Sequence, residues 1–351
     1  MAPKAKKKKA KAKAKRKRAA RPQKLRVGMI GVGGIAQGHI RRFLDTKKVE
    51  IPAISDPAQK SIDRTNGNFP ELAQKWAIYD DYRQMLKEVD LDAVCICSLH
   101  TQHYEQIMDS LKKDLHVLVE KPMTCTIERA KKVKASAARR KKVVQIAYQR
   151  HFMPPYRYVR QQIQSGKHGP VDFISVLQCQ NWLPITHTWR GDPKWSGGGQ
   201  INDSGSHLID IILWMTGLEP DEVFAYQENC GARVDILSAV SVRFTNKALC
   251  NVSIIGKSAV RGMWEDISIW ADKCAWMIRK NSVTECREGK ERVEVPDSKL
   301  PKASNVNANF VGSILGKEEP QTPPICGLRT IQLTQGAWDS ARLGKPVKVS
   351  T

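Results

Sequence analysis

Short apolar runs alternate with amphipathic stretches through the first 150 residues of the chain. Two segments, 102–112 and 126–140, have the apolar spacing of helices, and 79–86 has the character of a loop followed by the start of a helix. Apolar runs of strand length lie at 25–30, 49–55, 92–99, 115–119 and 143–148. Strands separated by helices of this length predict a parallel, doubly wound α/β sheet.

The pattern changes after residue 150. A helix is predicted over 202–215, ending at Gly217 before Pro220. We interpret 285–294, which is rich in Lys and Glu, as a surface loop. Runs of strand length lie at 173–180, 223–228, 237–244, 248–255, 267–271 and 275–279. They predict a second, α+β domain over 151–351, in which a largely antiparallel sheet buries one face and leaves the other open.

Residues 1–24 form a separate, strongly basic segment. They contain 13 Lys or Arg and no acid, so they carry over half of the net charge of +23 and leave +10 for residues 25–351. Because like charges repel along such a segment, we predict a disordered tail. Tails of this kind bind polyanions non-specifically by releasing counterions. The alternative is a solvated tail without a specific partner.

Composition narrows the protein class further. Hydrophobic residues make up 41% and charged residues 26% of the 351 residues, as in a soluble globular protein. No apolar run approaches the roughly 20 residues that cross a bilayer, so no membrane association is expected. The nine cysteines form no C-x-x-C pair. This favours free thiols in a reducing, cytoplasmic compartment and no metal site.

The turn after the first apolar run is rich in glycine. Residues 31–36 (GVGGIA) form a G-x-G-x-x-A pattern between a strand and a helix. In that context the pattern predicts a Rossmann dinucleotide-binding domain over 25–150. Gly31 permits the tight turn, and Gly33 lets the backbone approach a pyrophosphate held at the helix N-terminus. We therefore assign to the cofactor site Gly31, Gly33, Gly34 and Ile35.

The second apolar run is followed by Asp56, 25 residues after Gly31. An acid at this position accepts hydrogen bonds from the adenosine ribose hydroxyls and favours NAD over NADP. Two alternatives stay open: Asp56 is a turn residue before Pro57, and Lys60 accommodates the 2′-phosphate of NADP. Ligands of parallel sheets bind beyond the carboxyl ends of the strands. This adds to the cofactor site Ser98, Glu120 and Lys121.

Ordered motifs extend this interpretation over most of the chain. They are the glycine turn with His39 in the next helix, Asp56-Pro57, 98–103, Glu120-Lys121-Pro122, 149–152, Trp189-Arg190, 197–210 and 339–347. Over about residues 25–348 the sequence resembles the Gfo/Idh/MocA oxidoreductases, named after glucose–fructose oxidoreductase and inositol 2-dehydrogenase. Ser98-Leu99 departs from the Thr-Pro that the family often has there. His103 is nearly in the family's place and joins the cofactor contacts.

The resemblance implies roles for three residues. His207 acts as the acid/base, Lys121 is its partner in a proton relay, and Asp203 binds substrate hydroxyls or orients His207. If 202–215 is helical, Asp203 and His207 share one face, because they are four residues apart. Asp210 lies on the same face and either supports the site or forms a helix salt bridge. The family also implies a homo-oligomer that is formed through the open sheet face.

Aromatic residues crowd the loop before Gly197, where Trp182, Trp189 and Trp195 lie close together in the sequence. Indole faces pack well against sugar or inositol rings, and arginine donates several hydrogen bonds. Core packing explains most tryptophans, so only part of this group is assigned to the substrate. The expected substrate contacts are Arg150, Trp189, Arg190, Asp203 and His207.

The expected function is that of an NAD(P)-dependent oxidoreductase. It transfers hydride between the nicotinamide and a secondary alcohol of a sugar, sugar derivative or cyclic polyol. A redox-assisted glycosidase or lyase with regenerated NAD uses the same residues, so it stays open. The third alternative is a non-catalytic dinucleotide sensor whose basic tail binds nucleic acid. The intact set of Lys121, Asp203 and His207 argues against the sensor.

Overall fold

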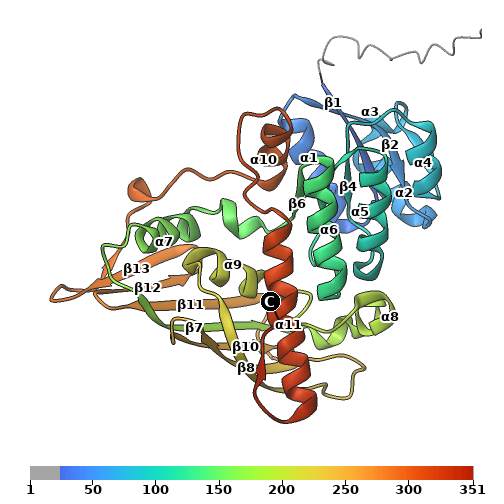
Figure 1. Cartoon of the computed structure of the whole chain (residues 1–351). Coiled ribbons are helices and arrows are strands. Elements are labelled where there is room, and N and C mark those ends of the chain that lie inside the picture. The colour runs from blue at the N-terminus through green and yellow to red at the C-terminus, as the bar shows by residue number, and fades with distance from the viewer. Residues whose placement is uncertain (1–23, 351) are drawn as a thin grey trace, which may run out of the picture.

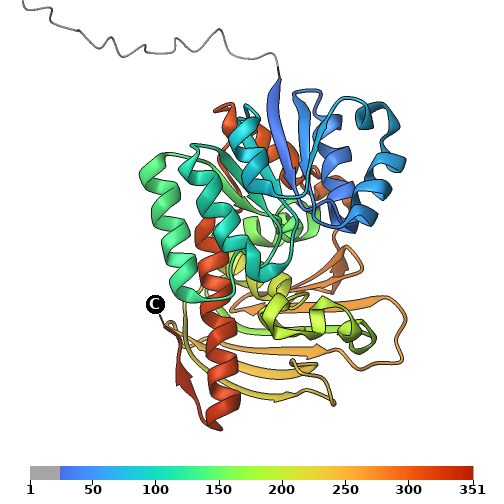
Figure 2. The same ribbon diagram turned by 90° about the vertical axis from the view of Figure 1, so that its right-hand side faces the viewer.

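The computed structural model describes residues 24–350, so the predicted tail lies outside the described residues except for Lys24. The strands form two sheets. One has six strands in the order β3-β2-β1-β4-β5-β6, and the other has nine in the order β14-β13-β12-β11-β7-β10-β9-β8-β15. The two sheets lie in separate parts of the molecule, and the red helix α11 (Pro324–Leu343) runs beside both (Figure 1; Figure 2).

The six-stranded sheet is parallel throughout, which confirms the predicted doubly wound sheet. Its strands are β1 (Leu25–Ile30), β2 (Val49–Ser55), β3 (Ala77–Tyr79), β4 (Ala93–Ile96), β5 (His116–Val119) and β6 (Val144–Ile146). The accompanying helices are α1 (Gly34–Asp45), α2 (Gln59–Asn68), α3 (Pro70–Ala73), α4 (Tyr82–Glu88), α5 (His103–Lys112) and α6 (Ile127–Arg140). The edge strand β3 was not predicted from the sequence, because it is only three residues long and two of them are exposed.

The nine-stranded sheet is antiparallel except between β7 and β10, which confirms the largely antiparallel second sheet. Its strands are β7 (Val171–Gln180), β8 (Pro220–Glu228), β9 (Leu237–Phe244), β10 (Leu249–Ile255), β11 (Met263–Ala271), β12 (Cys274–Arg279), β13 (Ser282–Arg287), β14 (Val293–Glu294) and β15 (Val347–Lys348). Helices α7 (Pro154–Gln164) and α9 (Ser206–Thr216) lie on one face of this sheet (Figure 1). The remaining helices are α8 (Pro193–Ser196) and α10 (Val306–Ile314).

The prediction of a surface loop over 285–294 holds for only part of the segment, since residues 287–294 are exposed but only 288–292 lie outside strands. This segment begins within β13 and includes β14, which pairs with β13. The charged Glu285 is buried because its carboxylate accepts hydrogen bonds from Trp276 at 3.0 Å and Tyr158 at 3.1 Å. These partners come from other elements, so the charge pattern of the segment alone could not indicate a strand.

The predicted helix over 202–215 begins later than expected, at Ser206, although Gly217 ends it in a left-handed conformation as predicted. The preceding residues form a turn. The carboxylate of Asp235 holds this turn by accepting hydrogen bonds from the amides of Gly199 (3.0 Å) and Ile201 (2.9 Å). Asp203 therefore lies in the turn rather than one helical step before His207.

The last part of the chain returns to the first sheet. Phe310 of α10 packs on Phe43 of α1 with ring centroids 6.3 Å apart, inside the first hydrophobic core. Leu328 and Ile331 of α11 join another cluster that lines the same sheet. The segment 306–331, which the sequence assigns to the second domain, thus holds the two parts of the molecule together.

Two further expectations concern the cysteines and the membrane. All nine cysteines are free thiols, and five of them are buried. Among residues 24–350, no helix is long and apolar enough to cross a bilayer.

Candidate active site

A cavity of about 990 Å³ opens at the carboxyl ends of the strands of the first sheet and extends to the second domain. The residues predicted for the site gather on its walls from segments far apart in the sequence. The predicted residues that line it are Gly31, Gly33, Gly34, Ile35, Asp56, Ser98, Glu120, Lys121, Trp189, Arg190 and His207. Residues predicted from motifs of the first domain and from motifs after residue 150 thus line the same cavity.

One end of the cavity has the shape of a dinucleotide site. Gly31 has a φ of +80°, and a Cβ there would lie 2.8 Å from the backbone of Cys97. At Gly33 and Gly34 a Cβ would meet nothing within 4 Å, so the backbone of the turn is open to a ligand. The helix α1 begins here without a side-chain cap and without an acid in its first turn. Its amides therefore fit the pyrophosphate of a dinucleotide.

Replacing Gly31 with alanine should disrupt this turn. A left-handed backbone and a clash with the Cys97 backbone together predict a loss of roughly 2 kcal/mol in the free energy of unfolding. The affinity for NADH should also fall, because the same turn is expected to bind the pyrophosphate. Thermal unfolding and a fluorescence titration measure both effects. The matched control is Gly67→Ala in α2, where a Cβ meets nothing within 4 Å and stability should be unchanged or higher. Equal stability of the two variants would contradict this account of the turn.

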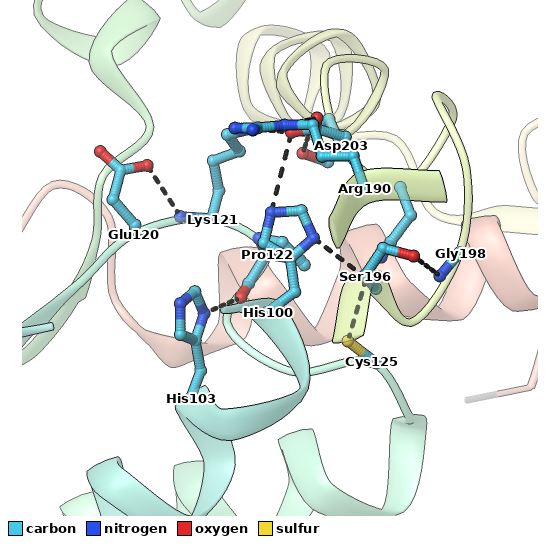
Figure 3. Close-up of polar contacts among 12 residues, drawn as sticks. His100, His103, Glu120, Lys121, Pro122, Cys125, Arg190, Ser196, Gly198 and Asp203 are labelled. Atoms are coloured by element: carbon cyan, nitrogen blue, oxygen red, sulfur yellow. Dashed lines mark hydrogen bonds and ion pairs between the residues drawn. The ribbon is translucent and has the colours of Figure 1, made fainter. Parts of the chain in front are cut away.

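The central ion pair of the site joins the two domains. Lys121 follows β5 of the first sheet, and its Nζ contacts both the carboxylate of Asp203 and, at 3.2 Å, the Asp203 carbonyl oxygen (Figure 3). Burial alone would raise the pKa of Asp203, but the charges of Lys121 and Arg190 outweigh burial and hold that pKa well below its usual range. The carboxylate is thus ionised and fixes the lysine ammonium in place.

Asp203 itself is buried behind the cavity wall. Its Oδ2 accepts hydrogen bonds from Arg190 Nε at 2.9 Å and from Trp182 Nε1 at 3.3 Å. The Arg190 guanidinium also lies over the ring of Trp189, 4.4 Å from its centroid. Since three donors converge on one carboxylate, Asp203 organises the lysine, the arginine and the loop that carries the tryptophans.

His207 contributes a neutral imidazole to the same cavity. Burial, together with the charges of Arg150 and Lys121, lowers the pKa of His207 well below its usual range. The ring packs edge-on against Tyr148, with centroids 5.9 Å apart. Among residues 24–350, the Nδ1 atom of His207 has no hydrogen-bond partner. The arrangement leaves an unprotonated base next to a lysine ammonium.

Glu120 ties the lysine to the first domain. Its Oε2 accepts a hydrogen bond of 3.2 Å from the backbone amide of Lys121 (Figure 3). Its Oε1 lies 2.9 Å from His39 Nε2. His39 in turn lies 3.1 Å from Asn307 of α10. Burial opposes ionisation of Glu120, but His39 keeps its pKa below the usual value. The buried chain of contacts fixes the backbone that carries Lys121.

Besides Asp203, two predicted site residues are not brought to the cavity wall. His103 is fully buried, and its Nδ1 lies 2.8 Å from the carbonyl of Pro122, so it supports the lysine segment from below (Figure 3). Arg150 is buried and paired with Glu265. Asp210 pairs with His151 at 2.6 Å rather than with a residue on its own helix. These three residues support the site rather than line it.

Sequence reasoning missed other parts of the wall. Residues 80–83 follow the unpredicted strand β3 and line the cavity near Asp56. Gln149 and His100 line it next to Lys121. Their only signal was their place in the motifs 149–152 and 98–103, since neither residue type suggests a role by itself.

Comparison with protein families accounts for most of the chain. A model of an oxidoreductase family with an NAD-binding Rossmann fold, Gfo/Idh/MocA, matches residues 25–148. A model of the Gfo/Idh/MocA C-terminal domain matches residues 156–272. Both matches follow the division between the two sheets.

Individual relatives are more distant. The rhizopine catabolism protein MocA of Rhizobium meliloti is 31% identical over 56% of this chain and 59% of its own length. The inositol 2-dehydrogenase of Serratia proteamaculans is 24% identical over 70% of this chain and 75% of its own length. The chain thus matches less than two thirds of the MocA protein.

A solved structure extends the likeness to the fold of nearly the whole chain. The WlbA dehydrogenase from Bordetella pertussis, in complex with NADH and UDP-GlcNAcA, superposes with a TM-score of 0.82 at 19% identity. The match covers 94% of this chain and 98% of that one. At this identity the likeness concerns the fold.

Proposed function

Because this chain belongs to the Gfo/Idh/MocA family of oxidoreductases and carries its NAD-binding Rossmann domain, we propose that it oxidises a secondary alcohol of a sugar or cyclic polyol with NAD. The observation that carries the proposal is one cavity that holds the glycine turn at one end and the Lys121–Asp203 pair with His207 at the other. A dehydrogenase needs these two groups side by side.

The chemistry follows from the charges of the two groups. NAD, when bound, supplies the hydride acceptor. Lys121 binds the substrate hydroxyl and stabilises the negative charge that develops on its oxygen as the proton leaves. Burial and nearby positive charges lower the pKa of His207 and keep its ring neutral, so that it has an unprotonated nitrogen that can receive the proton, directly or through Lys121. Asp203 keeps the ammonium in position throughout.

The substrate class is supported by two further residues that line the cavity. Trp189 brings an apolar aromatic edge to a sugar or inositol ring, and the Arg190 guanidinium, which lies over that indole, offers donors to the ring hydroxyls. Inositol 2-dehydrogenase and a dehydrogenase solved with a nucleotide sugar are among the similar proteins.

The proposal is tested by following NADH formation with purified protein. The substrates are myo-inositol, D-glucose and methyl glucoside, each with NAD⁺ in excess. We expect saturable NADH accumulation with at least one of them. A redox-assisted lyase or glycosidase would cleave a glycoside without net NADH, and a sensor would bind NADH without turnover. Either result would contradict a net dehydrogenase.

Asp56 is proposed to set the preference for NAD. Its Oδ2 accepts from the amide of Val32 at 2.8 Å and its Oδ1 from Ala58 at 2.9 Å, on the cavity wall. Asp56→Ala should lower the ratio of the NADPH dissociation constant to the NADH dissociation constant by about tenfold. The variant loses an acceptor for the ribose hydroxyls of NADH and a negative charge that repels the 2′-phosphate of NADPH. Fluorescence titrations measure both constants. The control is the exposed Asp63→Ala in α2, and an unchanged ratio would leave Asp56 as a turn residue only.

The open face of the second sheet is proposed to bind a second copy of the chain. Four large apolar side chains point outward from it and are 40–69% exposed: Tyr226, Leu249, Trp264 and Trp270. Apolar residues gathered on one open sheet face favour an obligate interface. Sedimentation velocity should give at least a dimer, and a monomer at all concentrations would contradict the interface.

The basic segment 1–24 is proposed to bind polyanions. Deleting residues 2–24 should leave kcat and KM unchanged and greatly reduce salt-dependent binding to duplex DNA, because 13 positive charges are concentrated in the first 24 residues. Fluorescence anisotropy at low and high salt measures the change. Undiminished binding would assign the effect to the net charge of +10 on residues 25–351.

A further inference from the structure

We propose that His100 recognises the substrate by accepting a hydrogen bond at Nε2 from a hydroxyl next to the reacting carbon. This inference rests on the proposed function and extends it to the class of ligand that the site selects. His100 follows β4 in a short 3-10 helix, His100–Gln102, and lines the cavity with Lys121. The residue is 4% exposed. His100 is therefore a buried polar side chain on the wall of this cavity.

The contacts of the ring fix its protonation. Nδ1 lies 3.0 Å from the carbonyl oxygen of Ser196, which accepts hydrogen bonds only, so Nδ1 carries the proton (Figure 3). Burial lowers the pKa of His100 to about 3, and the ring is neutral at physiological pH. It follows that Nε2 carries no proton and is an acceptor.

The acceptor atom faces a second acceptor. His100 Nε2 lies 3.8 Å from Asp203 Oδ1, too far for a hydrogen bond between them and with no proton to share (Figure 3). Asp203 Oδ1 already accepts a hydrogen bond from Lys121 Nζ. Among residues 24–350, no group donates a hydrogen bond to His100 Nε2, so this acceptor is open to a donor group of a ligand.

The ring is also held against movement. Trp189 packs edge-to-face on His100, with centroids 4.8 Å apart and an interplanar angle of 87°. A preorganised acceptor beside an ionised carboxylate favours a ligand group that donates, which means a neutral hydroxyl. It disfavours a carboxylate or phosphate oxygen at the same point. The site thereby favours a substrate that carries a neutral hydroxyl on the carbon next to the oxidised one.

A purely structural role is the competing explanation, because the Nδ1 bond to Ser196 also holds α8 against the first domain. Two amide variants separate the roles. The amide of Asn reaches the place of Nδ1, and the amide of Gln reaches the place of Nε2. His100→Asn keeps a donor for Ser196 without the acceptor, and His100→Gln keeps the acceptor without the donor.

The experiment measures steady-state kinetics of both variants with NAD⁺ and myo-inositol, D-glucose or methyl glucoside. We expect His100→Asn to raise the KM of the sugar or polyol by about tenfold or more, with the KM of NAD⁺ changed by less than about twofold. His100→Gln should keep the sugar KM within about threefold of wild type. The separate NAD⁺ constant reports that the variants are folded.

Each outcome decides the question. Wild-type kinetics in His100→Asn, a loss in His100→Gln alone, or equal losses in both variants would overturn the acceptor role while leaving the dehydrogenase intact. An inactive wild type with all three substrates would contradict the proposed function and, with it, this inference.

Discussion

Replacing Lys121 with alanine is expected to lower kcat by about 10²–10⁴-fold while NADH affinity stays nearly unchanged. The ammonium is the positive charge nearest to the hydroxyl that would lose its proton, and Asp203 holds it there through two contacts. Without it, the developing alkoxide has no cation beside it. Stopped-flow or steady-state NADH formation measures the rate, and NADH fluorescence measures the affinity.

Two variants make the result interpretable. Lys121→Arg keeps a positive charge in the cavity but cannot release a proton at neutral pH. Its kcat should exceed that of Lys121→Ala if the lysine acts by its charge, and a kcat as low as that of Lys121→Ala would assign proton transfer to the lysine. The exposed Lys113→Ala, beside α5, removes a lysine remote from the cavity and should have wild-type kinetics. Wild-type turnover in Lys121→Ala would remove the lysine from the mechanism.

Replacing His207 with alanine is expected to have an effect of similar size, about 10²–10⁴-fold on kcat, because the proton acceptor of the cavity is lost. The low pKa of His207 adds a second expectation. A group whose pKa lies below its usual value keeps its neutral form as the pH falls, so the wild-type rate should not decline through the pH range where free histidine titrates. A pH profile of kcat measures this.

The control for His207 is His187→Ala, an exposed histidine of the loop before Trp189, which should leave kcat unchanged. NADH affinity should be retained in both variants. A wild-type rate in His207→Ala, or a rate that falls along the titration of an ordinary histidine, would contradict the role of a buried neutral base.

Much of the first domain could be predicted from the sequence because its strands are buried on both faces. The runs 25–30 and 49–55 are apolar and become β1 and β2 with these bounds. The edge strand β3 gives no such signal, since it packs only partly. Residues 80–83 of the cavity wall were missed for the same reason.

The sequence predicted which residues belong to the candidate site better than it predicted how they are arranged. The motifs indicated Lys121, Asp203 and His207, but the contact between Lys121 and Asp203 spans 82 residues and depends on how the two domains meet. The sequence suggested a helical pairing of Asp203 with His207, whereas Asp235, from outside the segment, holds Asp203 in a turn. The role of His100 depends on Ser196, 96 residues away. Contacts of this range arise from tertiary packing and leave no local pattern.

The central claim is net transfer of hydride from a secondary alcohol to NAD. The most direct measurement uses the substrate found among the tested polyols, deuterated at the carbon that is oxidised, and analyses cofactor and product by mass spectrometry. The account predicts reduced cofactor that is one mass unit heavier and a ketone formed in equal amount. Turnover of the polyol without deuterium in the cofactor, or no reduced cofactor at all, would contradict it.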